Sequence, residues 1–176
     1  MNDNPSKFIN RLEKELAGVN GDVTILCIGT DSVVYDSLGP LVGTMLLERG
    51  VGYMGGVKVV GHLGSLVHAK NLEERICEIS EDSFVIAVDA VLGDLSKLYQ
   101  VSLWAGGLKP GKGVGKDLPV VGDISIVGHV ATSALAAAMP LGNLVRLNVV
   151  YDMARFISST LYTVLETKNI RLRSIY

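Results

Sequence analysis

The side chains of this chain that could do acid–base chemistry occur at one kind of place, the point where an apolar run ends. Four residues share that position: Asp36, His62, Asp89 and His129. Two carboxyl groups within a few ångströms cannot both ionise cheaply, so one keeps its proton and the pair can act as acid and base on a shared water. The same pair with a histidine also fits a divalent metal that activates the water. The residue types alone leave both chemistries open.

The apolar runs before these side chains are predicted to be buried strands. They cover residues 23–28, 57–61, 84–88 and 124–127. Unbroken apolar runs of this length are typical of parallel strands that are buried on both faces. Apolar residues at helical spacing follow the first run from Leu38, with Pro40 in the first turn, and a second helix is expected over 66–79. This β-α-β-α-β order predicts parallel strands whose carboxyl ends meet at one edge of the sheet, where open α/β proteins bind ligands.

The second half of the chain departs from this alternation. Segment 98–104 has the composition of a strand, but only about eight residues separate it from Asp89, too few for a parallel crossover, so we expect an antiparallel or edge strand. A glycine-rich loop, 105–122, and a helix from Thr132 to just before Pro140 come next. A final helix over about 145–166 is expected to bury one apolar face: Leu147, Val150, Tyr151, Ala154, Ile157, Leu161 and Leu165.

With a short N-terminal helix inside residues 1–20, these elements predict a single domain over 1–176. Its fold class is α/β, a three-layer α/β/α sandwich with a mixed, mostly parallel sheet. The chain is 48% hydrophobic and 19% charged, which is typical of an ordered globular protein. A net charge of −2 argues against nucleic acid or an anionic membrane as a partner. No apolar run approaches membrane-spanning length, residues 1–10 do not resemble a signal peptide, and the two cysteines are expected to be buried thiols, so we expect a soluble cytoplasmic protein.

Each candidate residue also has a purely structural interpretation. Asp36 could cap the helix that follows it, Asp89 could close a turn, and the two histidines could be hydrogen-bonded loop residues. The common position of all four at strand ends favours a site. A phosphate-binding loop is excluded, because the spacing of Gly106, Gly111 and Lys112 is followed by a glycine in place of the required Ser or Thr.

Three segments resemble a known group of proteins. I-G-T-D-S-V-V-Y-D-S-L-G-P-L-V-G, around Asp36, resembles the first motif of the spore germination protease and of the hydrogenase maturation endopeptidases. F-V-I-A-V-D-A-V, around Asp89, resembles their second motif, and P-G-K-G-V-G-K resembles a loop of the germination protease. Over about residues 23–156 the chain most resembles the YyaC-like family of sporulation proteins, which implies a phosphorylase/hydrolase-like fold.

The resemblance also implies roles. Asp36 and Asp89 match the two aspartates of the germination protease, an atypical aspartic protease. In the hydrogenase endopeptidases an acidic residue, an aspartate and a histidine bind metal, which by strand order implies Asp36, Asp89 and His129 here. Substrate-binding roles are predicted for His62 and for three glycines of the loop: Gly111, Gly113 and Gly115. That loop would lie over an extended peptide.

We therefore expect an endopeptidase of spore formation that cleaves a protein or peptide with two aspartates, with or without a divalent metal. One alternative is a non-catalytic relative that keeps the cleft and binds a protein or peptide. A small-molecule hydrolase or phosphorylase on the same fold is a third interpretation, although the arginines, which are mostly on helices or in the C-terminal tail, disfavour a phosphorylase. The sequence names neither the substrate, the metal nor an oligomeric state.

Overall fold

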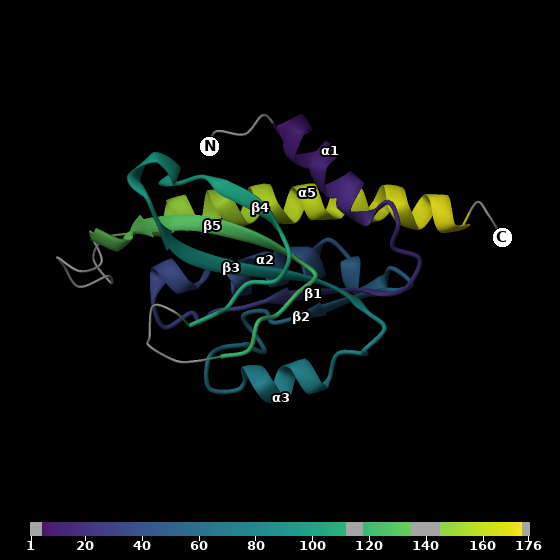
Figure 1. The fold of residues 1–176 in the computed structure, drawn as a ribbon, viewed down its shortest axis with the longest axis horizontal. Coiled ribbons are helices and arrows are strands. Elements are labelled where there is room, and N and C mark those ends of the chain that lie inside the picture. The colour runs from purple at the N-terminus through teal and green to yellow at the C-terminus, as the bar shows by residue number, and fades with distance from the viewer. Residues whose placement is uncertain (1–4, 112–117, 135–144, 174–176) are drawn as a thin grey trace.

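Five strands form a mixed sheet in a computed structural model of the chain, which describes residues 5–111, 118–134 and 145–173. The sheet has the order β2-β1-β3-β5-β4 (Figure 1). The strands are β1 Val23–Cys27, β2 Val57–Val60, β3 Phe84–Gly93, β4 Val101–Ala105 and β5 Ile124–Thr132. The first three strands and β5 run parallel, whereas β4 runs antiparallel to β5 at an edge of the sheet. The prediction for segment 98–104 is therefore confirmed.

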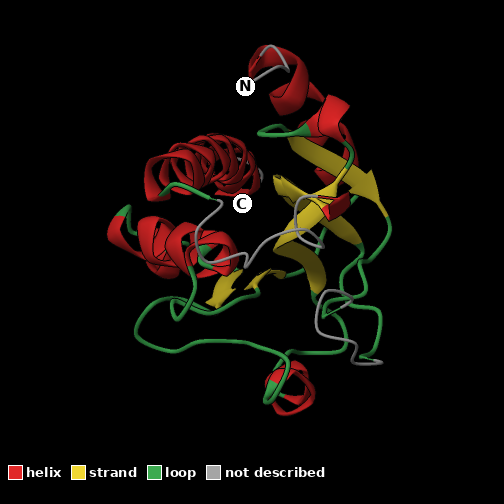
Figure 2. Cartoon of the chain, turned by 90° about the vertical axis from the view of Figure 1, so that its left-hand side faces the viewer, coloured by secondary structure: helices red, strands yellow, loops and turns green. Residues whose placement is uncertain are grey.

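Helices cover both faces of this sheet, as predicted (Figure 2). They are α1 Pro5–Leu16, α2 Leu38–Glu48, α3 Leu72–Cys77 and α5 Leu147–Arg173, with short 3-10 helices η1 Val34–Asp36, η2 Val51–Tyr53 and η3 Leu95–Lys97. Helices α2 and α5 pack against one face and against each other, while α3 lies on the opposite face. Helix α1 contacts α5 through an edge-to-face pair of rings, Phe8 and Phe156, with centroids 5.4 Å apart.

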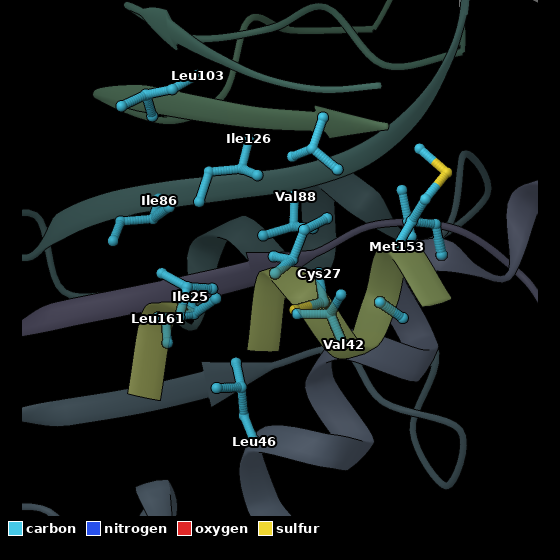
Figure 3. Close-up of a cluster of buried hydrophobic side chains, with 14 of the residues drawn as sticks. Ile25, Cys27, Val42, Leu46, Ile86, Val88, Leu103, Ile126, Met153 and Leu161 are labelled. Atoms are coloured by element: carbon cyan, nitrogen blue, oxygen red, sulfur yellow. The ribbon is translucent and has the colours of Figure 1, made fainter. Parts of the chain in front are cut away.

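The larger hydrophobic core lies between the sheet and helices α2 and α5 (Figure 3). Side chains from four strands and both helices meet there, among them Ile25, Val42, Leu46, Ile86, Val88, Leu103, Ile126, Met153 and Leu161. A second cluster under α3 takes the opposite side of β1, so every residue of that strand is buried. Burial raises the pKa of the Cys27 thiol, whereas Cys77 is exposed, contrary to expectation.

Two strands are longer than the sequence predicts, and this changes the position of two candidate residues. Asp89 and His129 were expected just beyond strand ends, but both lie inside strands. The reason is that β3 and β5 pair with each other from Ile86 and Ile124 as far as Gly93 and Thr132, with one irregularity in register. This pairing satisfies backbone groups that neither apolar run could pair alone.

Three helix predictions are also corrected. The helix predicted over 66–79 begins only at Leu72, and Thr132 ends β5, while most of the helix expected after it lies outside the described residues. On α5, Leu147 and Tyr151 are 56% and 48% exposed, although both were expected to be buried. Within the described ranges, none of the helices has the length and apolarity needed to cross a membrane.

Candidate active site

Asp36 is held over the carboxyl end of β1 by the glycine that follows the strand. Gly29 has φ +141°, a backbone conformation that residues with a side chain rarely adopt. A Cβ at this position would lie 2.0 Å from the backbone oxygen of Asp36. That oxygen also accepts a hydrogen bond from the Thr30 N–H, at 3.1 Å. The close approach, possible only with glycine, places Asp36 at the end of η1, two residues before α2.

Asp89 lies on the neighbouring strand β3, and only 7% of it is exposed. Its Oδ1 accepts a hydrogen bond of 2.8 Å from the N–H of Ala90. The link to Asp36 runs through the end of β1, since the Ile28 N–H donates to the Val88 oxygen at 2.8 Å. Val88, which precedes Asp89, is thus hydrogen-bonded to Ile28, which precedes Gly29.

The two carboxyl groups interact, and their pKa values are raised to different extents. Burial raises the pKa of Asp36 to about 6, partly offset by the Thr30 backbone N–H and by the charge of His68. Burial, and then the negative charge of Asp36, raise the pKa of Asp89 well above its usual range. The repulsion acts on Asp89 because Asp36 loses its proton first. The two carboxyl groups therefore have unlike pKa values, and Asp36 is the one that ionises first.

His129 faces a different set of groups. It is 3% exposed, its Nε2 lies 3.0 Å from the hydroxyl oxygen of Ser102, and its ring meets the edge of Trp104 at a centroid distance of 6.2 Å. Among the residues that the structure describes, its Nδ1 has no hydrogen-bond partner, and it faces Gly93, where a Cβ would lie 2.5 Å away. Burial and the charge of Lys97 lower the pKa of His129, so a neutral ring that donates from Nε2 to Ser102 fits this place best.

These contacts also test the three-residue metal set that the resemblance implies. In the part of the chain that the structure describes, no three His, Cys, Asp or Glu side chains form a group that could hold a metal ion. The third implied ligand, His129, has its Nε2 at Ser102 and its Nδ1 against Gly93. The residues present do not fit that set, and the chemistry proposed below uses the chain's own groups alone.

A different histidine, His68, acts on one member of the carboxyl pair, Asp36. It lies in the loop between β2 and α3, and its charge lowers the pKa of Asp36. The backbone explains the proximity: the Gly29 N–H donates to the oxygen of Val67 at 2.8 Å. One glycine therefore positions both Asp36, through its own close approach, and the residue next to His68.

Comparisons with known proteins show the family and the fold of the chain. Residues 1–160 match the family model described as "Protein of unknown function (DUF1256)". The chain belongs to the DUF1256 family. A relative called "Uncharacterized protein YyaC", from Bacillus subtilis (strain 168), is 42% identical over 142 residues, which cover 79% of this chain and 67% of the relative. The YyaC-like resemblance predicted from the motifs is thus confirmed.

A solved structure is similar to this DUF1256 chain in fold. It is the [NiFe] hydrogenase maturation protease HycI from Thermococcus kodakarensis KOD1, with a TM-score of 0.61 and 15% sequence identity. The match covers 89% of this chain and 99% of HycI. Identity this low shows the fold alone, which is the α/β fold of a hydrogenase maturation protease.

The structure places the predicted substrate-binding residues of this DUF1256 member as follows. His62 follows β2, and its Nδ1 accepts a hydrogen bond from the Gly64 N–H at 3.1 Å, inside its own turn. Gly111 has φ +75° at the end of a described stretch, whereas Gly113 and Gly115 lie outside the described residues. The base of the glycine-rich loop is anchored, since Leu108 and Val121 bond to each other at 3.0 and 2.9 Å and are buried.

Sequence reasoning missed His68 because it assigned a helix to residues 66–79, and that helix includes the histidine. A signal against that helix was present. Asn71 precedes Leu72, Glu73 and Glu74, and an Asn followed by acidic residues in a first turn is typical of a helix start. A start there leaves His68 in the loop between β2 and α3.

Proposed function

We propose that this protein is a peptide-bond hydrolase, an endopeptidase that acts on a protein or peptide in the cytoplasm of a sporulating cell. The observation that supports it is the interacting pair of carboxyl groups, in which the pKa of Asp36 is raised to about 6 and that of Asp89 well above its usual range. The motifs around both aspartates, with their resemblance to the spore germination protease, support the peptide substrate and the setting.

The pair can carry out hydrolysis with all protons accounted for. The Asp36 carboxylate takes a proton from a water molecule while the water oxygen attacks the carbonyl carbon of the peptide bond. Asp89 gives its proton to the carbonyl oxygen, which forms a tetrahedral diol. Asp36 then gives its proton to the leaving nitrogen as the C–N bond breaks, and Asp89 recovers a proton from a diol hydroxyl. The products are a carboxylic acid and an amine, and both aspartates return to their starting states.

The test is cleavage of candidate spore proteins by the full chain and by the variants Asp36→Asn and Asp89→Asn. Asparagine has the shape of aspartate and can still cap a helix, but it neither takes a proton from water nor gives one as an acid. Each variant should lose at least about 100-fold in kcat/KM. The double variant should be hardly worse than either single one, because the two groups act as a unit.

Two controls decide between the alternatives. Asp31→Asn changes an exposed carboxylate of the same loop and should leave cleavage unchanged. A chelator should have no effect if the aspartates act without metal. If the wild type cleaves no candidate while a partner protein still binds at the carboxyl pair, the proposal fails and the chain is a non-catalytic binding relative.

A further inference from the structure

Tyr99, just before β4, has a backbone conformation that favours glycine. Its φ is +61°, and among the residues that the structure describes it is the only one other than glycine with a positive φ. It is the third residue of a type II turn: Leu98 has φ −52° and ψ 131°, and the Gln100 N–H donates to the Lys97 oxygen at 2.9 Å. This place in a type II turn normally takes glycine or asparagine, because larger residues are strained there. The turn therefore does not explain a tyrosine.

Packing does not explain this tyrosine either. Tyr99 is 41% exposed and belongs to neither hydrophobic cluster. Two other large apolar side chains of the same segment are exposed as well, Leu95 by 76% and Trp104 by 36%. Exposed apolar side chains that gather in one segment are typical of a surface that binds another molecule.

The turn lies at the end of the sheet where β3 and β5 finish (Figure 1). The Tyr99 N–H donates to the His129 oxygen at 2.8 Å, and His129 pairs with Val91, two residues beyond Asp89 on β3. Two strand spacings and two residues along a strand correspond to about 12 Å between the Cα atoms of Asp89 and Tyr99. An extended peptide at the carboxyl pair covers that distance with about three or four residues.

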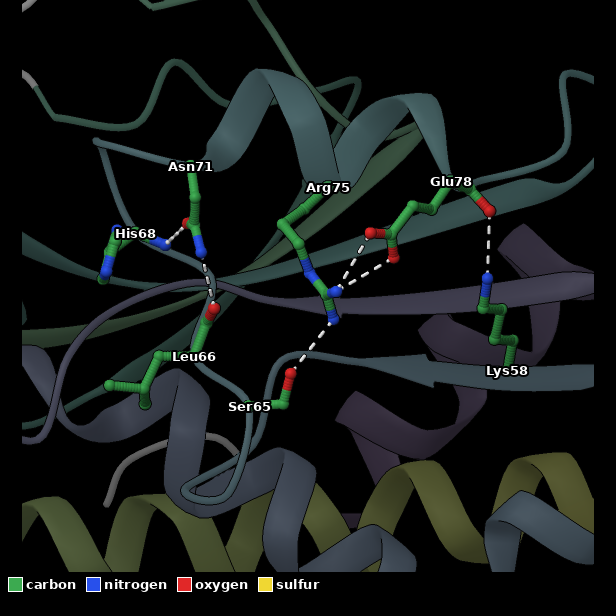
Figure 4. A network of polar contacts seen from close by, with 7 residues as sticks. All are labelled: Lys58, Ser65, Leu66, His68, Asn71, Arg75 and Glu78. Atoms are coloured by element: carbon green, nitrogen blue, oxygen red, sulfur yellow. Dashed lines mark hydrogen bonds and ion pairs between the residues drawn. The ribbon is translucent and has the colours of Figure 1, made fainter.

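The other flank of the carboxyl pair has a different character. There the polar side chains of the loop between β2 and α3 bond groups of the protein itself (Figure 4). Asn71 accepts the His68 N–H at 2.8 Å, and Arg75 donates to Ser65 at 3.3 Å and pairs with Glu78 at 3.0 Å. The flank toward β2 thus has polar groups that are already paired, whereas the flank toward β4 has exposed apolar side chains.

We propose that Tyr99 is a specificity-determining residue: its ring contacts an apolar side chain of the peptide substrate, about three or four residues from the cleaved bond. The inference rests on the proposed hydrolase function and adds a substrate preference to it. An aromatic ring offers a large apolar surface with few rotatable bonds, so it suits such a contact. The contact also gives a reason for a strained residue, since strain of this kind occurs where a side chain has a function.

The test uses the full chain and a library of fluorogenic peptides in which each position around the cleaved bond is varied in turn. The wild type should prefer leucine or phenylalanine over glycine at one such position, by about tenfold in kcat/KM. Tyr99→Asn removes the ring, suits a positive φ and should lose that preference, mainly through a higher KM. Tyr99→Phe should keep it. Tyr53→Asn changes a tyrosine of η2 that is 92% exposed and should behave as wild type.

The melting temperature of Tyr99→Asn is a second measurement, and it does not depend on activity. This variant should melt at least as high as the wild type, because asparagine adopts a positive φ more readily than tyrosine does. A clearly lower melting temperature would mean that the fold needs the ring, which would overturn the inference.

Binding tells the failure of this inference from the failure of the proposed hydrolase. The same peptides are immobilised and probed with the wild type and with Tyr99→Asn. Cleavage with an unchanged preference in Tyr99→Asn overturns the inference and leaves the hydrolase. Binding that requires the Tyr99 ring, without any cleavage, overturns the hydrolase and supports the contact. Neither cleavage nor binding of any peptide overturns both.

Discussion

Asp89 and His129 occupy matched places in the sheet but face opposite kinds of surroundings. They lie inside neighbouring strands, almost buried, and on the same face, because Asp89 pairs with Val127 and His129 is two residues further along β5. Asp89 meets the negative charge of Asp36, and its Oδ1 accepts the N–H of Ala90. His129 meets a hydroxyl group on one side of its ring and a glycine on the other.

The contrast shows that a buried ionisable group is not by itself a site. Burial lowers the pKa of His129, and its ring bonds Ser102, which joins β5 to β4. Burial first, and then the charge of Asp36, raise the pKa of Asp89 well above its usual range, so this carboxyl group holds its proton longer than its neighbour does. Carboxyl groups that interact and have unlike pKa values are an arrangement suited to general acid–base catalysis.

The largest expected difference between the two places is in the dependence of cleavage on pH. Asp36 must be ionised to take a proton, and burial raises its pKa to about 6. Below that value kcat/KM should fall by about tenfold per pH unit, and at high pH it should fall again as Asp89 ionises. Ser102→Ala alters the surroundings of His129 and should leave the pH at which kcat/KM falls on the acid side unchanged. If that fall shifts to another pH in Ser102→Ala, the low-pH loss of activity belongs to His129 instead of Asp36.

The next effect concerns stability at His129. Ser102→Ala removes the one hydrogen-bond partner of the His129 ring and should lower the free energy of unfolding by about 1–3 kcal/mol, with kcat little changed. Urea denaturation measures this loss. Thr163→Ala, which removes an exposed hydroxyl that donates to the Ser159 oxygen at 3.0 Å, should cost clearly less. A stable Ser102→Ala that has lost activity would make His129 and Ser102 the functional pair.

The smallest effect is on the stability of the carboxyl site. The pKa of Asp89 is higher in the folded than in the unfolded chain, so its contribution to stability is greatest at low pH and is lost as pH rises toward the folded value. Asp89→Asn should therefore melt higher than the wild type, by roughly 2–4 °C for each kcal/mol recovered. The difference between the two melting temperatures should grow from pH 5 to pH 8.

Asp31→Asn, an exposed site in the loop after β1, is the control for that measurement. Its melting temperature should follow that of the wild type at every pH. Equal melting temperatures for the wild type and Asp89→Asn at pH 8 would mean that burial of Asp89 carries no cost, contrary to the raised pKa.

Much of the fold could be predicted from the sequence because its signals are local. Unbroken apolar runs located every parallel strand, the helical spacing after Leu38 located α2, and the short connection after β3 set the direction of β4. Asp36 and Asp89 could be chosen for the same reason, since a carboxylate after an apolar run needs no knowledge of distant residues. The ends of β3 and β5 could not be predicted from the sequence, because the two strands pair with each other past their apolar parts.

The sequence by itself determined the parallel sheet, the glycine after β1 and the two aspartates as candidates, because each depends on residues close together in the chain. Only the tertiary structure decided which histidine accompanies them. The charge of His68 acts on Asp36, and Gly29 bonds Val67, the residue before His68, whereas His129 bonds Ser102, a residue 27 positions away on an antiparallel strand. Contacts of this kind depend on how strands and loops pack in space, and no local pattern of residue types records them.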